Sequence, residues 1–236
     1  MNGKIIPLVA DVTSRESLAA AAAAVRAKEG YVDVVLANSG VYDLDAPTFS
    51  SAEPPPPSEV QSKLWDVPIE SFNQVLHVNV SGVLYTAVAF LDLLDAANHR
   101  QPPATFPPRP KSQVIIVSSI CAFTRSPSFS FAYVASKAAA TQMAKQLATT
   151  LAPYKIRVNT IAPGMYPTEM NSHILKDSNP RIEGNIPAAF CPLGRSGTED
   201  EMSGLALYLI SRAGAYVNGS VSITDGGMLS LLPASY

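Results

Sequence analysis

Tyr133 and Lys137 lie four residues apart, and their side chains are of types that can do acid–base chemistry together. In a helix, residues four apart share a face, so the phenol and the ammonium would act on one small volume. Hydride transfer to or from a carbonyl carbon requires a proton to move at the carbonyl oxygen, and an acid–base group must stand there. A free tyrosine ionises near pH ~10, and a nearby ammonium lowers that pKa because it stabilises the phenolate. The pair therefore predicts oxidoreductase chemistry.

The spacing of this pair is weak evidence by itself, because short motifs recur by chance. A helix whose tyrosine packs in the core and whose lysine is solvated would show the same pattern. The choice between these two interpretations depends on the rest of the chain.

The elements that would position the pair alternate between apolar strands and amphipathic helices. Apolar runs typical of parallel strands covered on both faces occur at residues 5–10, 32–37, 114–117, 156–161 and 220–224. Helices are expected at residues 13–30, where a capping box precedes a run of alanines, at about 71–97, over the stretch that carries Tyr133 and Lys137, and at roughly 199–210. This alternation predicts an α/β fold, a three-layer doubly wound parallel sheet of the Rossmann-like type.

Composition favours one globular domain over residues 1–236, with 47% hydrophobic and 15% charged residues. A net charge of −2 gives no electrostatic reason to expect nucleic acid or an anionic membrane as a partner. No apolar stretch is long and uncharged enough to predict a membrane span, and the first residues do not resemble a signal peptide, so we expect a cytoplasmic protein. The two cysteines and three histidines lack ligand-like spacing, so no metal site is expected.

Two proline-rich stretches interrupt the pattern, at residues 43–66 and 102–110. Proline cannot continue a helix or a central strand. We therefore expect both stretches to be surface loop insertions within the single domain, with a proline-rich recognition segment as the alternative.

Six short motifs occur along the chain in a particular order. They are Ala37-Asn38-Ser39-Gly40, Asn79-Val80-Ser81-Gly82, Ser118-Ser119 with Tyr133 and Lys137, the run at residues 156–164 with Thr168, Pro192-Leu193-Gly194-Arg195, and Asp225-Gly226-Gly227. Together they resemble the short-chain dehydrogenase/reductase superfamily, over residues 11–227. The first motif differs from the family's Asn-Asn-Ala-Gly turn at two positions.

The resemblance implies roles for four catalytic residues. Tyr133 would be the acid–base, and Lys137 would bind the ribose hydroxyls of the cofactor and lower the pKa of Tyr133. Ser119 would hydrogen-bond the substrate oxygen. Asn79 would hold a water that relays protons from Lys137, or it would be a backbone-bonded core amide or a helix kink. Ser118 is the alternative to Ser119, because the serine is one residue farther from Tyr133 than the family spacing places it.

The resemblance also implies a cofactor, NAD or NADP, without choosing between them. Its site would include Asp11, Asn38, Gly40, Pro163, Gly164 and Thr168, in addition to Tyr133 and Lys137. Helix capping is the alternative for Asp11 and Thr168. Residues 165–195 would form a substrate lid that contains His173, which we expect to be a solvated loop residue. The apolar lid residues Met165, Ile174, Leu175, Ile182 and Phe190 favour an apolar alcohol or carbonyl compound as substrate, and a homodimer or homotetramer is expected.

The chain departs from the family at its start. Family members carry a Thr-Gly-x-x-x-Gly-x-Gly turn, and none of the 13 glycines here has that spacing. Without the two or three charge-assisted hydrogen bonds to pyrophosphate, cofactor affinity would fall by roughly two to six decades. We expect residues 4–10 to pair beside residues 32–37 in the sheet instead of standing at an exposed edge. Two functions remain open: an NAD(P)-dependent oxidoreductase, or a non-catalytic relative, truncated at its N-terminus, that acts through assembly with partner subunits.

Overall fold

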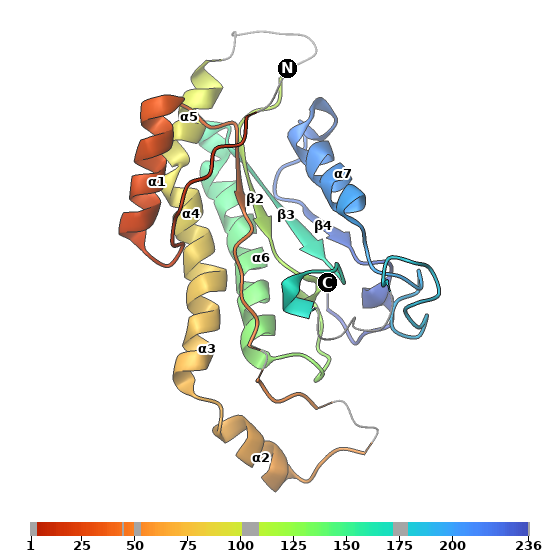
Figure 1. Cartoon of the computed structure of the whole chain (residues 1–236). Coiled ribbons are helices and arrows are strands. Elements are labelled where there is room, and N and C mark those ends of the chain that lie inside the picture. Colours follow the sequence, from red (N-terminus) through yellow and green to blue (C-terminus); the bar gives the residue numbers. More distant parts are fainter. Residues whose placement is uncertain (1–3, 44, 50–52, 101–108, 172–178, 236) are drawn as a thin grey trace.

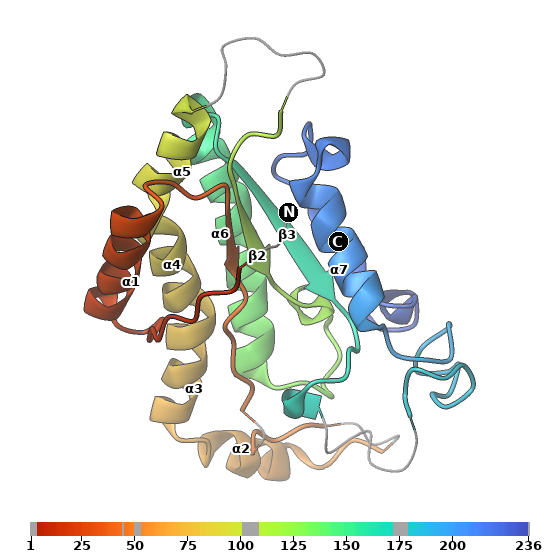
Figure 2. The same ribbon diagram turned by 45° about the horizontal axis from the view of Figure 1, so that its top comes forward.

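A computed structural model describes residues 4–43, 45–49, 53–100, 109–171 and 179–235. Its sheet has four parallel strands in the order β1 (Val34–Ala37), β2 (Gln113–Val117), β3 (Arg157–Pro163) and β4 (Val221–Thr224). Figures 1 and 2 show helices α1, α4 and α6 on one face of the sheet and α7 on the other. The expected three-layer, doubly wound α/β fold is therefore confirmed.

The strands are apolar on successive residues because both faces of the sheet are covered. Val35, Val114 and Ile116 pack against α4 and α6 in the larger core cluster. Their neighbours Val34 and Ile115 point the other way and pack against α7 in a second cluster. Alternation of side chains along a strand produces these two cores from one continuous apolar run.

Helix α1 (Arg15–Lys28) begins and ends close to where its sequence signals place it. Its N-cap is Ser14, whose side chain accepts a hydrogen bond from the Ser17 N–H, so the cap lies one residue later than a capping box that starts at Thr13. Gly30 follows the helix with a φ of 75°, a left-handed conformation that glycine adopts without steric cost.

The second expected helix is a longer and less regular column. It comprises α3 (Ile69–Leu76), a π-helical turn η1 (His77–Gly82), α4 (Val83–Ala89) and α5 (Leu91–His99). By length and composition this 31-residue run could cross a membrane, which is weak evidence because the core helix of a soluble protein meets the same test. Here Val83, Ala87 and Leu94 are buried against the sheet and α6.

The two remaining helices predicted from the sequence are also present. Helix α6 (Phe131–Leu151) is capped by Ser130, and α7 (Glu199–Ile210) is opened by a capping box between Thr198 and Glu201. Short turns complete the described elements: the 3-10 helices η2 (Ile120–Ala122), η3 (Ala152–Tyr154), η4 (Glu169–Asn171), η5 (Arg212–Gly214) and η6 (Met228–Ser230).

The prediction of a strand at residues 5–10 is wrong. Residues 4–10 form no strand in the structure, and Ile5 and Val9 are fully solvent-exposed (95% and 103%). Pro7 lacks the N–H that a strand needs to bond its neighbour, and that removes a hydrogen bond from the middle of the expected ladder. Within the described residues β1 therefore pairs only with β2, and Leu36 on β1 is half-exposed.

The first proline-rich stretch is not a loop throughout. It contains α2 (Pro57–Trp65), whose residues are all at least partly exposed. Pro57 stands at the first helical position, where its missing N–H costs nothing and its fixed φ suits the helix. Of the second stretch, residues 101–108 lie outside the described part of the chain.

Gly164 marks a close approach between the ends of β3 and β4. A Cβ at this position would lie 2.7 Å from the Cβ of Asp225 and 2.8 Å from its Cα. Gly164→Ala is therefore expected to lower the free energy of unfolding by about 1–3 kcal/mol, because backbone must move. Gly204→Ala on α7 is the matched control: no atom lies within 4 Å of its Cβ, and it should stabilise by about 0.5–1 kcal/mol. Equal effects of the two variants in urea unfolding would contradict this account.

Candidate active site

Tyr133 and Lys137 stand one turn apart near the start of α6 and face the same volume. The Lys137 Nζ lies 5.6 Å from the centre of the Tyr133 ring. Both side chains are nearly buried, with exposed fractions of 9% and 4%. The Lys137 ammonium donates a hydrogen bond to the carbonyl oxygen of Val117, at the end of β2, over 3.1 Å. The lysine is therefore not the solvated surface residue that the alternative interpretation required.

Of the two serines after β2, Ser119 is the one that reaches the phenol. Its side chain lies beside that of Tyr133, and its Oγ accepts a hydrogen bond from the Cys121 N–H over 3.1 Å. The Ser118 hydroxyl instead bonds the Lys137 carbonyl oxygen and Thr141 at the back of α6. The extra residue between the serine and Tyr133 does not separate the two side chains.

Burial dominates the ionisation of the pair. It raises the pKa of Tyr133, and the nearby Ser119 side chain only partly opposes this. Burial also lowers the pKa of Lys137 to about 8. The structure as it stands thus shows no net lowering of the Tyr133 pKa, because loss of hydration is the largest cause acting on the phenol. The expected lowering of that pKa by Lys137 stays a prediction. At neutral pH the Tyr133 phenol carries its proton.

Asn79 lies in the π-helical turn η1 and is fully buried. Its amide accepts a hydrogen bond from the Val41 N–H (2.8 Å) and donates to the Val41 carbonyl oxygen (2.9 Å) and to the Ser136 hydroxyl (3.0 Å). The amide thus joins three segments: the helical column, the loop after β1, and α6. This arrangement matches the alternative interpretation of Asn79 as a backbone-bonded core amide. The water relay stays a prediction.

Removing the Asn79 amide should destabilise the protein. Asn79→Ala takes a partner from the fully buried Ser136 hydroxyl and from the Val41 N–H and C=O, and we expect a loss of about 1–3 kcal/mol in the free energy of unfolding. Asn98→Ala is the control, because the Asn98 amide also makes three hydrogen bonds, all of them to backbone, but is only half-buried, so water can replace it. Urea denaturation of both variants measures the difference. A smaller loss for Asn79→Ala than for Asn98→Ala would refute the structural role of Asn79.

The turn after β1 brings its glycine against Asn79 and Lys137. A Cβ at Gly40 would lie 3.3 Å from both the Asn79 Oδ1 and the Lys137 Nζ. Asn38, two residues earlier, is exposed. Because β1, β2 and β3 are parallel, Gly40, Ser119 and Gly164 follow strand ends at one edge of the sheet, the edge where α/β folds bind ligands.

The other cofactor-binding candidates lie farther out on the surface. Asp11 is exposed, and its carboxylate accepts hydrogen bonds from the N–H and hydroxyl of Thr13, a local turn that leads into α1. Thr168 is exposed beyond β3, and Pro163 is the last residue of that strand, opposite Thr224. These contacts of Asp11 match the alternative interpretation, in which its carboxylate caps the start of a helix. The structure does not bring Asp11 or Thr168 into the buried cluster.

Two residues of the cluster, Tyr42 and Cys121, were not predicted from the sequence. The Tyr42 ring packs on that of Tyr133, with centroids 4.8 Å apart and planes at 57°, and its hydroxyl accepts a hydrogen bond from the Ser130 N–H. Cys121 is buried, and its backbone N–H donates a hydrogen bond to the Ser119 Oγ. The sequence signal that could have identified them is their position: Tyr42 lies two residues after Gly40, and Cys121 lies two residues after Ser119.

The expected lid is only partly described, since residues 172–178, with His173, Ile174 and Leu175, lie outside the described chain. Met165 packs against a buried cluster formed by Ile120, Ile186, Cys191, Met228 and Leu229. Ile182 and Phe190 are exposed. The apolar cluster is thus adjacent to the loop that follows Ser119, and it links that loop to the C-terminal motif.

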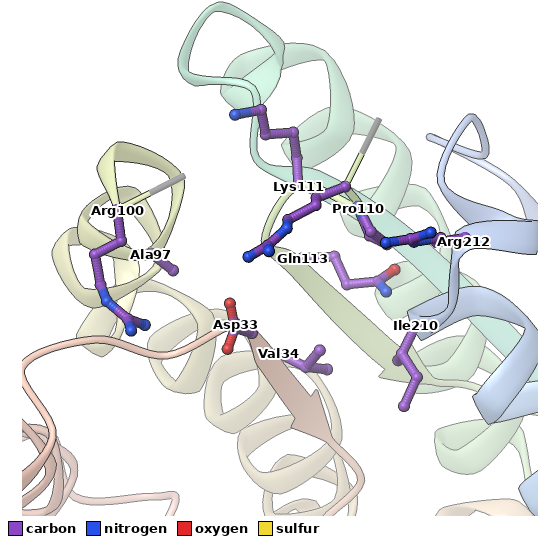
Figure 3. Close-up of a pocket in the computed structure, with 10 residues that line it drawn as sticks. Asp33, Val34, Ala97, Arg100, Pro110, Lys111, Gln113, Ile210 and Arg212 are labelled. Carbon is purple, nitrogen blue, oxygen red and sulfur yellow. The ribbon is translucent and has the colours of Figure 1, made fainter. Parts of the chain in front are cut away.

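A separate cavity of about 410 Å³ opens at the opposite edge of the sheet, at the amino ends of β1 and β2. Figure 3 shows Asp33, which precedes β1, and Val34, its first residue, on one side of this cavity. Gln113, Ile210 and Arg212 lie across from them. Basic residues here follow the C-terminal ends of α5 and α7, where cations offset the helix dipole. This cavity shares no residue with the Tyr133 cluster.

The fold and the cluster together define a Rossmann-like oxidoreductase, with a serine after the carboxyl end of β2 and a tyrosine and a lysine on α6. The chain belongs to the short-chain dehydrogenase/reductase superfamily: the family model described as "Enoyl-(Acyl carrier protein) reductase" matches residues 1–229. The resemblance found in the sequence is confirmed.

Named relatives and solved structures agree with this assignment. Short-chain dehydrogenase/reductase PhomF' of Diaporthe leptostromiformis is 41% identical over 235 residues, which cover 100% of this chain and 78% of that protein. Short-chain dehydrogenase/reductase SAT3 of Stachybotrys chartarum is 39% identical, covering 99% and 89%. The Pseudomonas aeruginosa RhlG/NADP active-site complex has a TM-score of 0.72 at 28% identity, covering 93% of this chain and 75% of that one. A gluconate 5-dehydrogenase from Burkholderia cenocepacia in complex with NADP and tartrate has a TM-score of 0.73 at 26% identity, covering 93% and 73%.

Proposed function

We propose that the chain binds NAD or NADP and interconverts an alcohol and a carbonyl compound, with Tyr133 as the acid–base. The position of the Ser119 side chain beside the Tyr133 phenol, with Lys137 on the same face of α6, carries this proposal. It places two hydroxyl groups where one substrate oxygen can meet both. Solved structures of two similar proteins in complex with NADP support the choice of cofactor.

The residues present fit the ribose and nicotinamide part of such a cofactor. Lys137 has three donors, of which the Val117 carbonyl oxygen takes one, so the ammonium can also bind ribose hydroxyls. Gly40 keeps the space beside that ammonium open, because a side chain there would meet Nζ and Asn79. When bound, the cofactor supplies or accepts the hydride.

This chain's own residues handle the proton. Ser119 donates to the substrate oxygen and holds it beside Tyr133, and the Tyr133 phenol gives its proton as that oxygen gains negative charge. The raised pKa of Tyr133 keeps the phenol protonated at neutral pH, which suits carbonyl reduction. Lys137 then holds a positive charge near the phenolate that forms, and burial strengthens that attraction.

The pyrophosphate part of the cofactor has no glycine-rich turn among these 236 residues. The alternative function is a relative that binds cofactor poorly and acts through assembly with partner subunits. Fluorescence titration with NADH and NADPH separates the two. Submillimolar binding, with oxidation of the reduced cofactor in the presence of ethyl acetoacetate or acetophenone, supports the enzyme. Absence of binding to both cofactors overturns it.

We also propose a homodimer or homotetramer. The column of α3 and α4 exposes Ile69, Tyr85 and Val88, and Phe131 at the start of α6 is half-exposed. Apolar side chains of this size on neighbouring helices are typical of an interface between copies. Light scattering on the purified chain gives its mass directly, and a monomer at micromolar concentration would contradict the proposal.

A further inference from the structure

Tyr42 contacts Tyr133 directly, although no motif predicted it and the proposed chemistry does not use it. It is half-buried in the loop that follows β1. Its ring packs against the Tyr133 ring, with centroids 4.8 Å apart and planes at 57°. Aromatic rings attract each other in tilted arrangements of this kind. The contact therefore restricts how far the Tyr133 side chain can swing toward Tyr42.

The hydroxyl of Tyr42 reaches the start of the helix that carries Tyr133. It accepts a hydrogen bond from the Ser130 N–H over 3.2 Å. Ser130 is fully buried and caps α6, and its own hydroxyl accepts a hydrogen bond from the Tyr133 N–H over 3.2 Å. Removal of the Tyr42 hydroxyl would take the acceptor from a buried N–H, which costs free energy. Ring and hydroxyl of Tyr42 thus hold both the Tyr133 side chain and the helical turn on which it stands.

The residue before Tyr42 is connected to the other side of Tyr133. The backbone of Val41 bonds the Asn79 amide through both its N–H and its C=O. That amide donates to the Ser136 hydroxyl, which in turn donates to the Tyr133 carbonyl oxygen over 2.7 Å. Two successive residues of one loop are therefore linked to the N–H and to the C=O of Tyr133. The loop and the first turns of α6 form one connected unit.

We propose that Tyr42 is a positioning residue that holds the Tyr133 phenol beside Ser119 and Lys137. The consequence for the reaction rests on the proposed function, in which Tyr133 gives its proton to the substrate oxygen. A proton donor must lie within hydrogen-bond reach of the oxygen that it protonates, and a misplacement of about 1 Å can cost about 10²-fold in rate. The position of the phenol is itself a property of the free protein, so it can also be measured without turnover.

Two substitutions separate the ring of Tyr42 from its hydroxyl. Tyr42→Phe keeps the ring and removes the acceptor of the Ser130 N–H, whereas Tyr42→Leu removes both. We expect Tyr42→Leu to lower kcat by about 10- to 100-fold, with KM changed by less than about three-fold. Tyr42→Phe should lower kcat by only about two- to ten-fold, the range of one neutral hydrogen bond. Tyr42→Met repeats the comparison with a longer apolar side chain if the leucine variant folds poorly.

A Tyr133→Phe background distinguishes positioning from a general loss of stability. Once the phenol is gone, Tyr42 has no proton donor to position, so Tyr42→Leu should lower the residual kcat by less than about two-fold. Equal fold losses in the two backgrounds would overturn the proposal. Tyr31→Leu is the matched control and should leave kcat unchanged. Tyr31 is also half-buried, but it lies at the other end of β1, where its ring packs against the Arg100 guanidinium.

Ring dynamics of the free protein provide a second measurement. In protein labelled with 13C in the tyrosine rings, Tyr133→Phe identifies the Tyr133 signals by their loss. Order parameters and relaxation dispersion of these carbons should show a fixed ring in the wild type, in Tyr42→Phe and in Tyr31→Leu, and a mobile ring in Tyr42→Leu. A Tyr133 ring that stays as fixed in Tyr42→Leu as in the wild type contradicts the proposal.

Failure of the proposed function has a different signature. Turnover would then be absent from the wild type or would survive Tyr133→Phe. The ring relaxation would still decide whether Tyr42 positions Tyr133.

Discussion

Tyr133→Phe is expected to lower kcat by about 10²–10⁴-fold, the range that a positioned acid–base group contributes. The phenol is the group in the cluster that lies both beside Ser119 and one helical turn from Lys137. Phenylalanine keeps the ring and its packing against Tyr42 and removes only the hydroxyl. Affinity for NADPH should change little, because Lys137 and the strand ends remain.

The measurement is single-turnover and steady-state oxidation of NADPH with the substrate that the wild-type chain reduces. Tyr216→Phe is the control, since it also removes a phenol but from a fully exposed side chain. Equal kcat values for wild type and Tyr133→Phe would remove Tyr133 from the mechanism, whatever its place in the structure.

Lys137→Met is expected to abolish turnover and yet to stabilise the free protein at neutral pH. Burial lowers the pKa of Lys137 from its ordinary 10.5 to about 8, so the folded protein carries an ammonium in a place that disfavours it. The difference corresponds to about 3 kcal/mol at pH below 8. Methionine has a similar length without the charge, so it avoids this penalty and keeps the packing.

The pH dependence has a definite sign. Between pH 8 and 10.5 the unfolded chain binds a proton at Lys137 and the folded chain does not, so the stability of the wild type rises with pH across this window. Lys137→Met lacks that rise. The advantage of the variant in urea unfolding should therefore be largest at pH 7 and shrink by about 1–2 kcal/mol by pH 9.5. A constant difference over this range would show that Lys137 is hydrated in the folded state.

The periodic elements could be predicted from sequence because their patterns are local. The run at residues 199–210 has a capping box at its start, and α7 has those bounds. The four strands of the sheet were expected within two residues at each end, since apolar runs bounded by turns admit few alternatives. Residues 5–10 have the same apolar pattern, but the strand predicted there does not form. A strand also needs a neighbouring strand to pair with, and distant parts of the chain set the position of that neighbour.

Spacing along the chain also placed Tyr133, Lys137 and Ser119 in one site, with Ser118 as an open alternative. Only the structure separated the two serines, by pointing Ser118 at the back of α6. Asn79 was singled out as a polar residue in an apolar stripe, and its partners come from Val41 and Ser136, 38 and 57 residues away. Such partners cannot be read from local pattern.

The sequence by itself determined the order of strands and helices, the oxidoreductase family and the residues able to move a proton, because those depend on residue type and short spacing. The tertiary structure alone decided how far each group is buried, and burial sets the direction of both pKa shifts in the pair. It also decided which neighbours complete the site, bringing Tyr42 onto Tyr133 and Cys121 onto Ser119. Hydration and hydrogen-bond partners depend on all segments that pack around a group, and those meet only when the chain has folded.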